Sequence, residues 1–375
     1  MKKVKILHCG DLHFDTPFKE LNNKLSWKCK EELLEVFKKI IDLVISENVQ
    51  ILLIAGDIFD NLSVNKETIS FIAKNLKRIE NVRVFISPGN HDPYNNKSFY
   101  KIIEWPENVY IFKSKMESVE IKELDTVIWG AAFNESYEKQ TLLENISIDN
   151  SKINIAVLHG EIESLNASNN YNPIYLEDIE KSKIDYIALG HRHKFSSIKR
   201  VGTSYYSYSG CPQGRGFDEL GEKGVVIGEV FKGGNSLKFV NTAKRKYYIE
   251  EIDVSGADNY EQIIKKILNV CKDKIRSNFY KIILRGELEE HFNLNEDILL
   301  NRLEDEFYYI KIVNSTSVKV DLKELVKDYS LKSKFILNMI NIIKENEDED
   351  KDIYNLALKL GIQCLSEEEV NLNDN

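Results

Sequence analysis

The stretch Ser87-Pro88-Gly89-Asn90-His91-Asp92 follows the apolar run Val82-Arg83-Val84-Phe85-Ile86. A β-branched run that ends in Pro-Gly predicts a buried strand leading into a tight turn. Asn and His at the tip of such a strand are poor core residues and good groups for binding metal or phosphate. Four other polar clusters also follow predicted strands, namely Asp11-Leu12-His13, Gly56-Asp57, His159-Gly160 and Gly190-His191-Arg192-His193. The sequence therefore predicts a site at which five loops meet.

Strands and helices alternate along the first hundred residues. Residues 4–7, 51–55 and 82–86 are apolar runs of strand length, whereas 31–45 and 69–79 carry apolar side chains at helical spacing. This order predicts an α/β layer whose polar loops gather at one end of the sheet. Residues 160–175 are polar and predict a loop over the site. Later apolar runs predict further strands at 126–131, 153–158, 185–189, 204–209, 224–231 and 236–243.

The sequence predicts three domains. A boundary is expected at Lys244-Arg245-Lys246, after which the order strand, helix, strand, helix, strand predicts a small α/β cap without chemically reactive clusters. We therefore expect a site-bearing domain at 1–245, a cap at 246–325 and a helical tail at 326–375. The tail carries an apolar stripe that is either core of the cap or a partner-docking helix, and we favour docking. The stripe consists of Phe335, Ile336, Met339, Ile340 and Ile343.

Composition indicates a globular protein of ordinary polarity, with 42% apolar and 30% charged residues in 375. The net charge of −9 is concentrated after residue 343, where ten acidic residues accompany three basic ones. This acidity neither supports nor excludes a polyanionic substrate for the rest of the chain. No apolar run reaches the ~18 residues of a membrane span, and the amino end lacks a signal-peptide core. The five cysteines are scattered without a Cys-x-x-Cys pair, so we expect a reducing cytoplasm and no membrane.

Seven residues of the five clusters are candidate metal ligands. Residues two apart on an extended backbone point to the same side, so Asp11 with His13, and His191 with His193, are expected to converge. The carboxylate, amide and imidazole donors suit Mn²⁺, Fe²⁺ or Zn²⁺. Seven donors exceed the need of one ion and fit two ions that share a carboxylate, an arrangement suited to displacement at phosphorus. The set is Asp11, His13, Asp57, Asn90, His159, His191 and His193.

The order of the clusters resembles a known superfamily. Asp-x-His, Gly-Asp-x-Phe-Asp, Gly-Asn-His-Asp, His-Gly and Gly-His-x-His look like the five motifs of the calcineurin-like metallophosphoesterases. Within that superfamily, residues 7–18 and 209–215 resemble the SbcD/YhaO DNA-repair exonucleases. The resemblance spans residues 1–245 and implies an α/β (α+β) four-layer fold, with two stacked mixed β-sheets flanked by helices. It also implies an SbcC/YhaN-like coiled-coil ATPase as partner and a homodimer.

The resemblance assigns roles residue by residue. It implies one metal ion on Asp11, His13, Asp57 and His193, with Asp57 bridging to a second ion on Asn90, His159 and His191. Two manganese ions are the implied cofactors. His91 would face the scissile phosphate and either stabilise charge or protonate the leaving oxygen. Asp92 would orient His91.

Several alternatives remain open on the residues alone. The favoured function is a two-metal DNA exonuclease, the second is a phosphoesterase for nucleotides or other small phosphates, and the third is a non-catalytic metal-binding assembly subunit. His8 is expected to be a core histidine. Asp15 and Asp60 are either residues that hydrogen-bond to the candidate metal ligands or simple turn residues. Basic residues near the site are either phosphate contacts or solvated surface, namely Arg192, Lys194, Lys199, Arg200 and Arg215.

Overall fold

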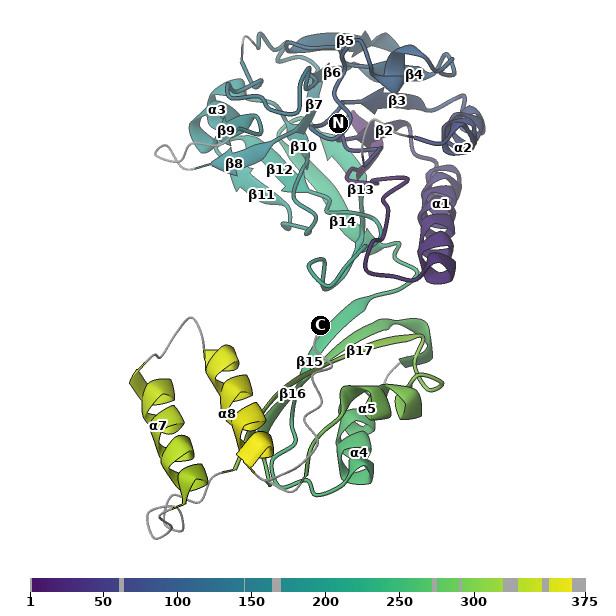
Figure 1. The fold of residues 1–375 in the computed structure, drawn as a ribbon. Helices are drawn as coiled ribbons and strands as arrows, with labels where there is room; N and C mark the ends of the chain where they lie inside the picture. Colours follow the sequence, from purple (N-terminus) through teal and green to yellow (C-terminus); the bar gives the residue numbers. More distant parts are fainter. Residues whose placement is uncertain are drawn as a thin grey trace. The chain divides into compact units, whose positions relative to one another are not determined.

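The computed structural model describes residues 2–60, 64–144, 146–163, 170–271, 275–289, 292–319, 330–345 and 351–365. The chain forms two compact units, Met1–Lys246 and Tyr247–Asn375 (Figure 1). The unit boundary lies beside the basic cluster at 244–246. The finer division into 1–245, 246–325 and 326–375 stays a prediction.

The first unit contains two six-stranded mixed sheets. Sheet 1 has the order β14-β13-β1-β2-β3-β4, in which β1 to β4 run parallel and β13 and β14 pair antiparallel. Its strands are β1 (Lys3–Cys9), β2 (Ile51–Ile54), β3 (Arg83–Ile86), β4 (Val109–Ile111), β13 (Gly224–Phe231) and β14 (Gly234–Asn241).

Sheet 2 has the order β11-β12-β10-β7-β6-β5, with β6, β7, β10 and β12 parallel and β5 and β11 antiparallel at the edges. Its strands are β5 (Glu117–Ile121), β6 (Thr126–Gly130), β7 (Ile153–His159), β10 (Tyr186–Gly190), β11 (Lys199–Val201) and β12 (Ser204–Tyr208). A small parallel pair, β8 (Glu161–Glu163) and β9 (Pro173–Tyr175), lies within the expected loop. The middle of that loop, 164–169, lies outside the described residues.

The two sheets stack face to face, with helices on the outer faces (Figure 1). A predominantly apolar core joins them, with side chains such as Ile6 and Leu53 from sheet 1 and Ile155 and Ala188 from sheet 2. Helices α1 (Asn23–Ser46) and α2 (Lys66–Lys77) flank sheet 1. Helix α3 (Leu176–Ser182) contributes Ile179 to the core on the outer side of sheet 2. The four-layer α/β fold expected from the sequence is confirmed. Its physical cause is that each sheet buries both of its faces, one against the other sheet and one against helices.

Helix α1 shows how the sequence produces these layers. The Asn22 side chain accepts from the backbone N–H of Leu25 and so caps the helix at its start. The buried face of α1 follows the helical spacing of apolar residues in the sequence. It consists of Cys29, Glu32, Leu33, Val36, Phe37, Ile40, Ile41 and Val44. Within the described part of the chain, short 3-10 helices occur at Phe99–Lys101, Lys122–Leu124 and Ile275–Ser277.

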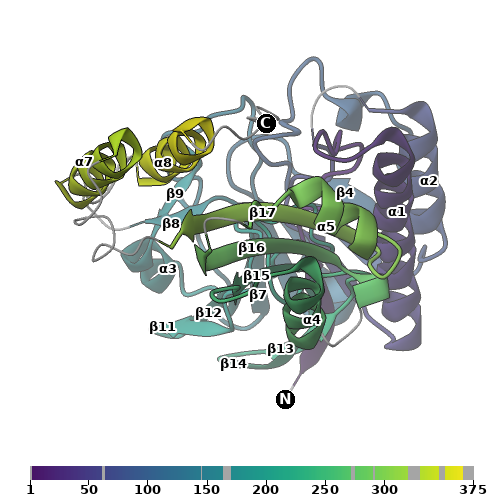
Figure 2. The same ribbon diagram turned by 60° about the horizontal axis from the view of Figure 1, so that its bottom comes forward.

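The second unit is a three-stranded parallel sheet with helices. Strands β15 (Tyr247–Asp253), β16 (Phe279–Leu288) and β17 (Tyr309–Val318) pair in sequence order, and α4 (Tyr260–Val270) and α5 (Glu296–Leu303) pack on the sheet (Figure 2). Helices α7 (Leu331–Glu345) and α8 (Lys351–Leu365) pack on each other, with Ile336, Leu358 and Ile362 buried between them. The predicted stripe on α7 is thus partly used within the unit.

Two further sequence expectations concern membrane-spanning segments and the cysteines. No helix among the described residues is long and apolar enough to cross a membrane. All five cysteines carry free thiols, and the four at positions 9, 29, 211 and 271 are buried.

Candidate metal centre

Five of the seven candidate ligands lie at the carboxyl ends of parallel strands. Asp11 follows β1, Asp57 follows β2 and Asn90 follows β3 in sheet 1. His159 ends β7 and His191 directly follows β10 in sheet 2. Because the sheets stack with these ends on the same side, the loops of both sheets meet there.

The backbone at these strand ends is unusual. Asp11, His13, Asp57 and His191 have positive φ angles of 52°, 46°, 49° and 107°. Residues other than glycine rarely adopt this left-handed region, and its strain is concentrated at functional sites. The expectation that Asp11 and His13, and His191 and His193, converge along extended backbone is therefore wrong in its reason, since Asp11, His13 and His191 have left-handed backbone conformations.

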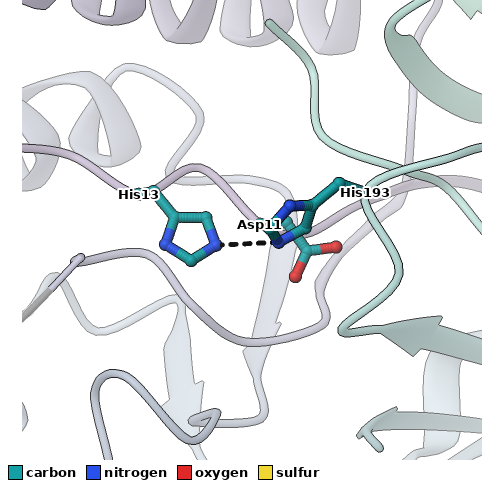
Figure 3. A group of neighbouring side chains, drawn as sticks. All are labelled: Asp11, His13 and His193. Atoms are coloured by element: carbon teal, nitrogen blue, oxygen red, sulfur yellow. Dashed lines mark hydrogen bonds between the residues drawn. The ribbon is translucent and has the colours of Figure 1, made fainter. Parts of the chain in front are cut away.

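His13 and His193 form the first group of the site, together with Asp11 (Figure 3). Their Nε2 atoms lie 3.2 Å apart. The Nδ1 of His13 lies 3.1 Å from Asp60 Oδ1, and the Nδ1 of His193 lies 2.8 Å from Glu219 Oε1. A carboxylate only accepts, so each Nδ1 carries the proton and each Nε2 presents a lone pair. When both rings are neutral, the two Nε2 lone pairs face each other, as two ligands of one metal ion would.

His159 belongs to the second group. Its Nδ1 donates to the Ala55 carbonyl oxygen at 2.9 Å, which leaves Nε2 as a lone pair 2.9 Å from Asn90 Oδ1. The His191 ring lies beside it, with the ring centroids 5.2 Å apart. The His191 Nε2 lies 3.5 Å from Glu161 Oε2. In the second group the His159 Nε2 lone pair thus faces Asn90 Oδ1, whereas the His191 Nε2 faces the Glu161 carboxylate.

Asp57 lies between the two groups. Its Oδ1 accepts from the His91 backbone N–H at 3.0 Å. Its Oδ2 lies 3.6 Å from His13 Nε2 and 3.4 Å from His159 Nε2. Two ligands of one divalent ion, each at about 2.0–2.2 Å from it, lie about 3 to 3.5 Å apart. The donor set therefore fits a pair of divalent ions with the Asp57 carboxylate between them.

Burial dominates the electrostatics of this pocket. It raises the pKa of Asp11 and Asp57 and lowers the pKa of His13 and His159. Burial also lowers the pKa of His193, but the hydrogen bond to Glu219 and the charge of Asp11 outweigh it, so that this pKa is raised. Cations reverse these penalties, because they stabilise carboxylates and bind neutral imidazole. A metal ion at His193 would have to displace the proton that this ring tends to hold.

The two expected catalytic residues occupy different environments. His91 is exposed, its ring lies edge-on to His13 with centroids 4.8 Å apart, and its Nδ1 donates to the Asp60 carbonyl oxygen at 2.8 Å. Asp92 is buried and does not orient the His91 ring, which corrects that expectation. Its carboxylate instead accepts from the backbone N–H groups of Gly89, Ile58 and Phe59 and from the Tyr100 hydroxyl.

The structure adds residues to the site that the sequence does not predict and resolves others that the sequence leaves open. Asp60, left open between two interpretations, contacts His13, whereas Asp15 contacts Asn65 and Thr68 away from it. Glu219 carries no motif signal, because it reaches His193 only through tertiary structure. Arg215 does not face solvent as a phosphate contact, since its side chain is 13% exposed and pairs with Asp60 and Glu219.

Comparison with known proteins places these features in context. The family model described as "Calcineurin-like phosphoesterase" matches residues 4–195, which contain all seven candidate ligands. "Uncharacterized metallophosphoesterase YhaO" of Bacillus subtilis (strain 168) is 28% identical over 302 residues, 76% of this chain and 73% of that protein.

Two further relatives have names that refer to DNA repair or nuclease activity. "DNA double-strand break repair protein Mre11" of Sulfolobus acidocaldarius is 24% identical over 373 residues, 94% of both chains. One of the subunits of the nuclease SbcCD of Staphylococcus epidermidis is 24% identical over 301 residues, 68% of this chain and 77% of that protein.

Proposed function

The chain belongs to the calcineurin-like phosphoesterase family, and on that premise we propose that it is a two-metal DNA exonuclease that hydrolyses the DNA backbone in repair or end processing. The observation that carries the proposal is the Asp57 carboxylate, one oxygen of which lies within 3.6 Å of a lone-pair nitrogen in each histidine group. A metallophosphoesterase activity follows from the family. What the proposal adds to the family's activity is that the substrate is DNA.

The proposed ligand sets follow the two groups of the site. Asp11, His13, Asp57 and His193 would hold one ion, and Asn90, His159 and His191 would complete the second with Asp57 shared. Two divalent ions, for which we propose Mn²⁺, would neutralise phosphate charge and activate a water molecule when bound. The carboxylates of Asp11 and Asp57 offset only part of such a dication pair, so the pocket would attract a phosphodiester.

His91 would act on the substrate directly. Its Nδ1 hydrogen is committed to the Asp60 carbonyl oxygen, so Nε2 is the ring atom left to face a phosphate. That atom donates a hydrogen bond, or a proton to the leaving oxygen, only when the ring is an imidazolium. The exposure of His91 beside buried His13 supports this role.

The names of the relatives support DNA as substrate and a partner protein. Mre11 is named for double-strand break repair, and the Staphylococcus protein is named as one component of a nuclease. We therefore propose a homodimer that works with an SbcC/YhaN-like ATPase. Exposed apolar residues on α7 and α8, namely Leu331, Ile353 and Leu356, support docking at the tail. The free cysteines fit a reducing cytoplasm.

A substrate panel tests the proposal. Purified chain with Mn²⁺ is given linear single- and double-stranded DNA, bis(p-nitrophenyl) phosphate and cyclic nucleotides, with a chelator as control. We expect DNA to be degraded from its ends. If the chain binds two ions but leaves DNA intact, with and without the ATPase, while it cleaves a small phosphate, the small-molecule function replaces the proposal.

A further inference from the structure

Residues 209–223, which follow β12, support His193 from behind. The Lys223 Nζ donates to the His193 carbonyl oxygen at 2.6 Å, and the Glu219 carboxylate receives the His193 Nδ1 hydrogen at 2.8 Å. Lys223 and Glu219 are both buried, with 3% and 5% exposure. Two buried charged groups thus fix both the backbone and the ring of one candidate ligand.

Arg215, from the same segment, connects this support to a second histidine. Its Nη2 lies 2.5 Å from Glu219 Oε1, and its backbone N–H donates to Glu219 Oε2 at 2.8 Å. Its Nη1 donates to Asp60 Oδ1 at 3.2 Å, the oxygen that faces His13 Nδ1. One guanidinium therefore touches the carboxylate behind each of the two histidines.

Proton accounting shows that Arg215 acts through the carboxylates. Its Nη2 also lies 3.2 Å from His193 Nδ1. Arginine has donors only, and an Nδ1 that gives its hydrogen to Glu219 cannot also accept one. The productive contacts of the guanidinium are therefore those with Asp60 and Glu219. Without the guanidinium, the Glu219 and Asp60 carboxylates, 4% and 17% exposed, would lose their shared counter-charge and would be free to turn away from the rings.

The other histidines of the site are held differently. His159 donates to a backbone carbonyl, that of Ala55. His191 lies against Glu161, which in turn pairs with Arg192. Among the interactions that the described residues show, neither of these supports includes Arg215. The two groups of the centre thus have separate supports.

We infer that Arg215 is a positioning residue that orients His13 and His193 as one unit, and so controls the affinity of one of the two metal positions independently of the other. This inference rests on the two-metal centre of the proposed function. It adds that the two positions are tuned separately, and that the segment 209–223 belongs to the centre although it contributes no ligand.

The test measures metal binding rather than activity. Mn²⁺ is titrated calorimetrically into the metal-free full chain and into Arg215→Met, and electron paramagnetic resonance distinguishes a coupled ion pair from a single ion. We expect the affinity of one ion to fall by about 10–100-fold in the variant, the usual effect of losing a residue that orients a ligand. The second ion should keep an affinity close to that of the unmodified chain.

Two further variants complete the design. Arg245→Met is a matched control, because Arg245 is a similarly buried arginine, 12% exposed, that pairs with Glu32 of α1. It should lower stability without changing either metal affinity. Arg215→Lys should rescue poorly, since an ammonium cannot span two carboxylates as a guanidinium does. Thermal unfolding in the presence of a chelator shows whether each variant is folded.

Specific outcomes overturn the inference. If Arg215→Met binds both ions as the unmodified chain does, the bridge has no role in the centre. If both ions weaken equally and the chelated protein unfolds at lower temperature, Arg215 is a residue of the fold alone. Should Arg215→Met not fold, Glu219→Gln takes its place, with the same selective loss expected. A wild-type chain that binds no Mn²⁺ at all would instead refute the proposed function.

Discussion

The Tyr100 hydroxyl donates to the Asp92 carboxylate at 2.6 Å, and both side chains are buried. The same carboxylate also accepts from backbone N–H groups of the loops that follow β2 and β3. Asp92 thus fastens together the two loops that carry Asp57 and Asn90.

Asp92→Asn should destabilise the metal-free protein. Every group that faces the carboxylate is a donor, so either orientation of an amide would place an NH₂ group against a donor. We expect a loss of about 1–3 kcal/mol in the free energy of unfolding, measured by urea denaturation with a chelator present. Tyr100→Phe, which removes one donor only, should cost about 1 kcal/mol. An Asp92→Asn variant as stable as the unmodified chain would contradict this account.

His8 should contribute to the acid sensitivity of the fold. It is fully buried between Tyr186 and the Leu189 carbonyl, and burial lowers its pKa from 6.5 to about 3. As pH falls below about 6.5, the unfolded chain binds a proton at His8 that the folded chain does not. Stability should therefore fall by on the order of 1 kcal/mol per pH unit from this group, down to roughly pH 3.

The variant His8→Gln isolates that contribution. The slope of unfolding free energy against pH should be shallower in His8→Gln than in the unmodified chain between pH ~6 and ~4. Tyr186→Phe is the control, since it removes a hydrogen-bond partner and keeps the imidazole. Parallel slopes for all three proteins would mean that His8 is not neutral in the fold.

Asp57 and His91 should separate metal binding from catalysis. Asp57→Ala removes the oxygen that both histidine groups face, and we expect it to weaken both ions and abolish hydrolysis. His91→Ala should keep both ions, because Nε2 of His91 is assigned to the substrate. Its activity should fall by about 10²–10⁴-fold, the usual contribution of a positioned acid or base. Metal content and hydrolysis of bis(p-nitrophenyl) phosphate are measured on the same samples; full activity in His91→Ala would remove it from the mechanism.

Gly190→Ala should disturb the group around His159. A Cβ on Gly190 would lie 1.8 Å from the Ala55 carbonyl oxygen, the atom that accepts from His159 Nδ1, and 3.0 Å from that nitrogen. The backbone must move, so we expect a loss of about 1–3 kcal/mol and a weaker ion at His159. Gly233→Ala is the control. A Cβ added at Gly233 would have no heavy atom within 4 Å, so this substitution brings only the backbone strain of a φ of 75° and no steric clash. Calorimetric titration with Mn²⁺ checks both; unchanged affinity in Gly190→Ala would show that this approach does not matter.

The sequence predicts the layers well because burial is periodic. The apolar run before Asp57 has no polar position and the run before Asn90 has only Arg83, so a strand with both faces covered is the simplest structure for them. The reason given for convergence fails, however, since Asp11 and His13 adopt left-handed conformations. Such conformations depend on the surrounding loops and leave no periodic signal.

The supporting residues were harder to predict than the candidate ligands. Glu219 lies 26 residues after His193 in sequence and contacts it only in the folded chain. The sequence leaves Arg215 open between a phosphate contact and solvated surface, because composition does not reveal burial. The expected loop at 160–175 contains β8 and β9, and Asn172 donates to the His159 carbonyl oxygen at 2.7 Å. Polar residues that satisfy buried backbone groups look like loop residues in a sequence.

Asp11, Asp57 and Asn90 extend from one sheet, and His159, His191 and His193 extend from the other. A cation pair at this position would cross-link the two halves of the β-sandwich at its rim. Occupancy of the centre should then slow hydrogen exchange in both rims together, by the stabilisation RT ln(1 + c/Kd) that free metal at concentration c adds to the folded chain. The metal ions proposed for catalysis would therefore also stabilise the packing of the two sheets.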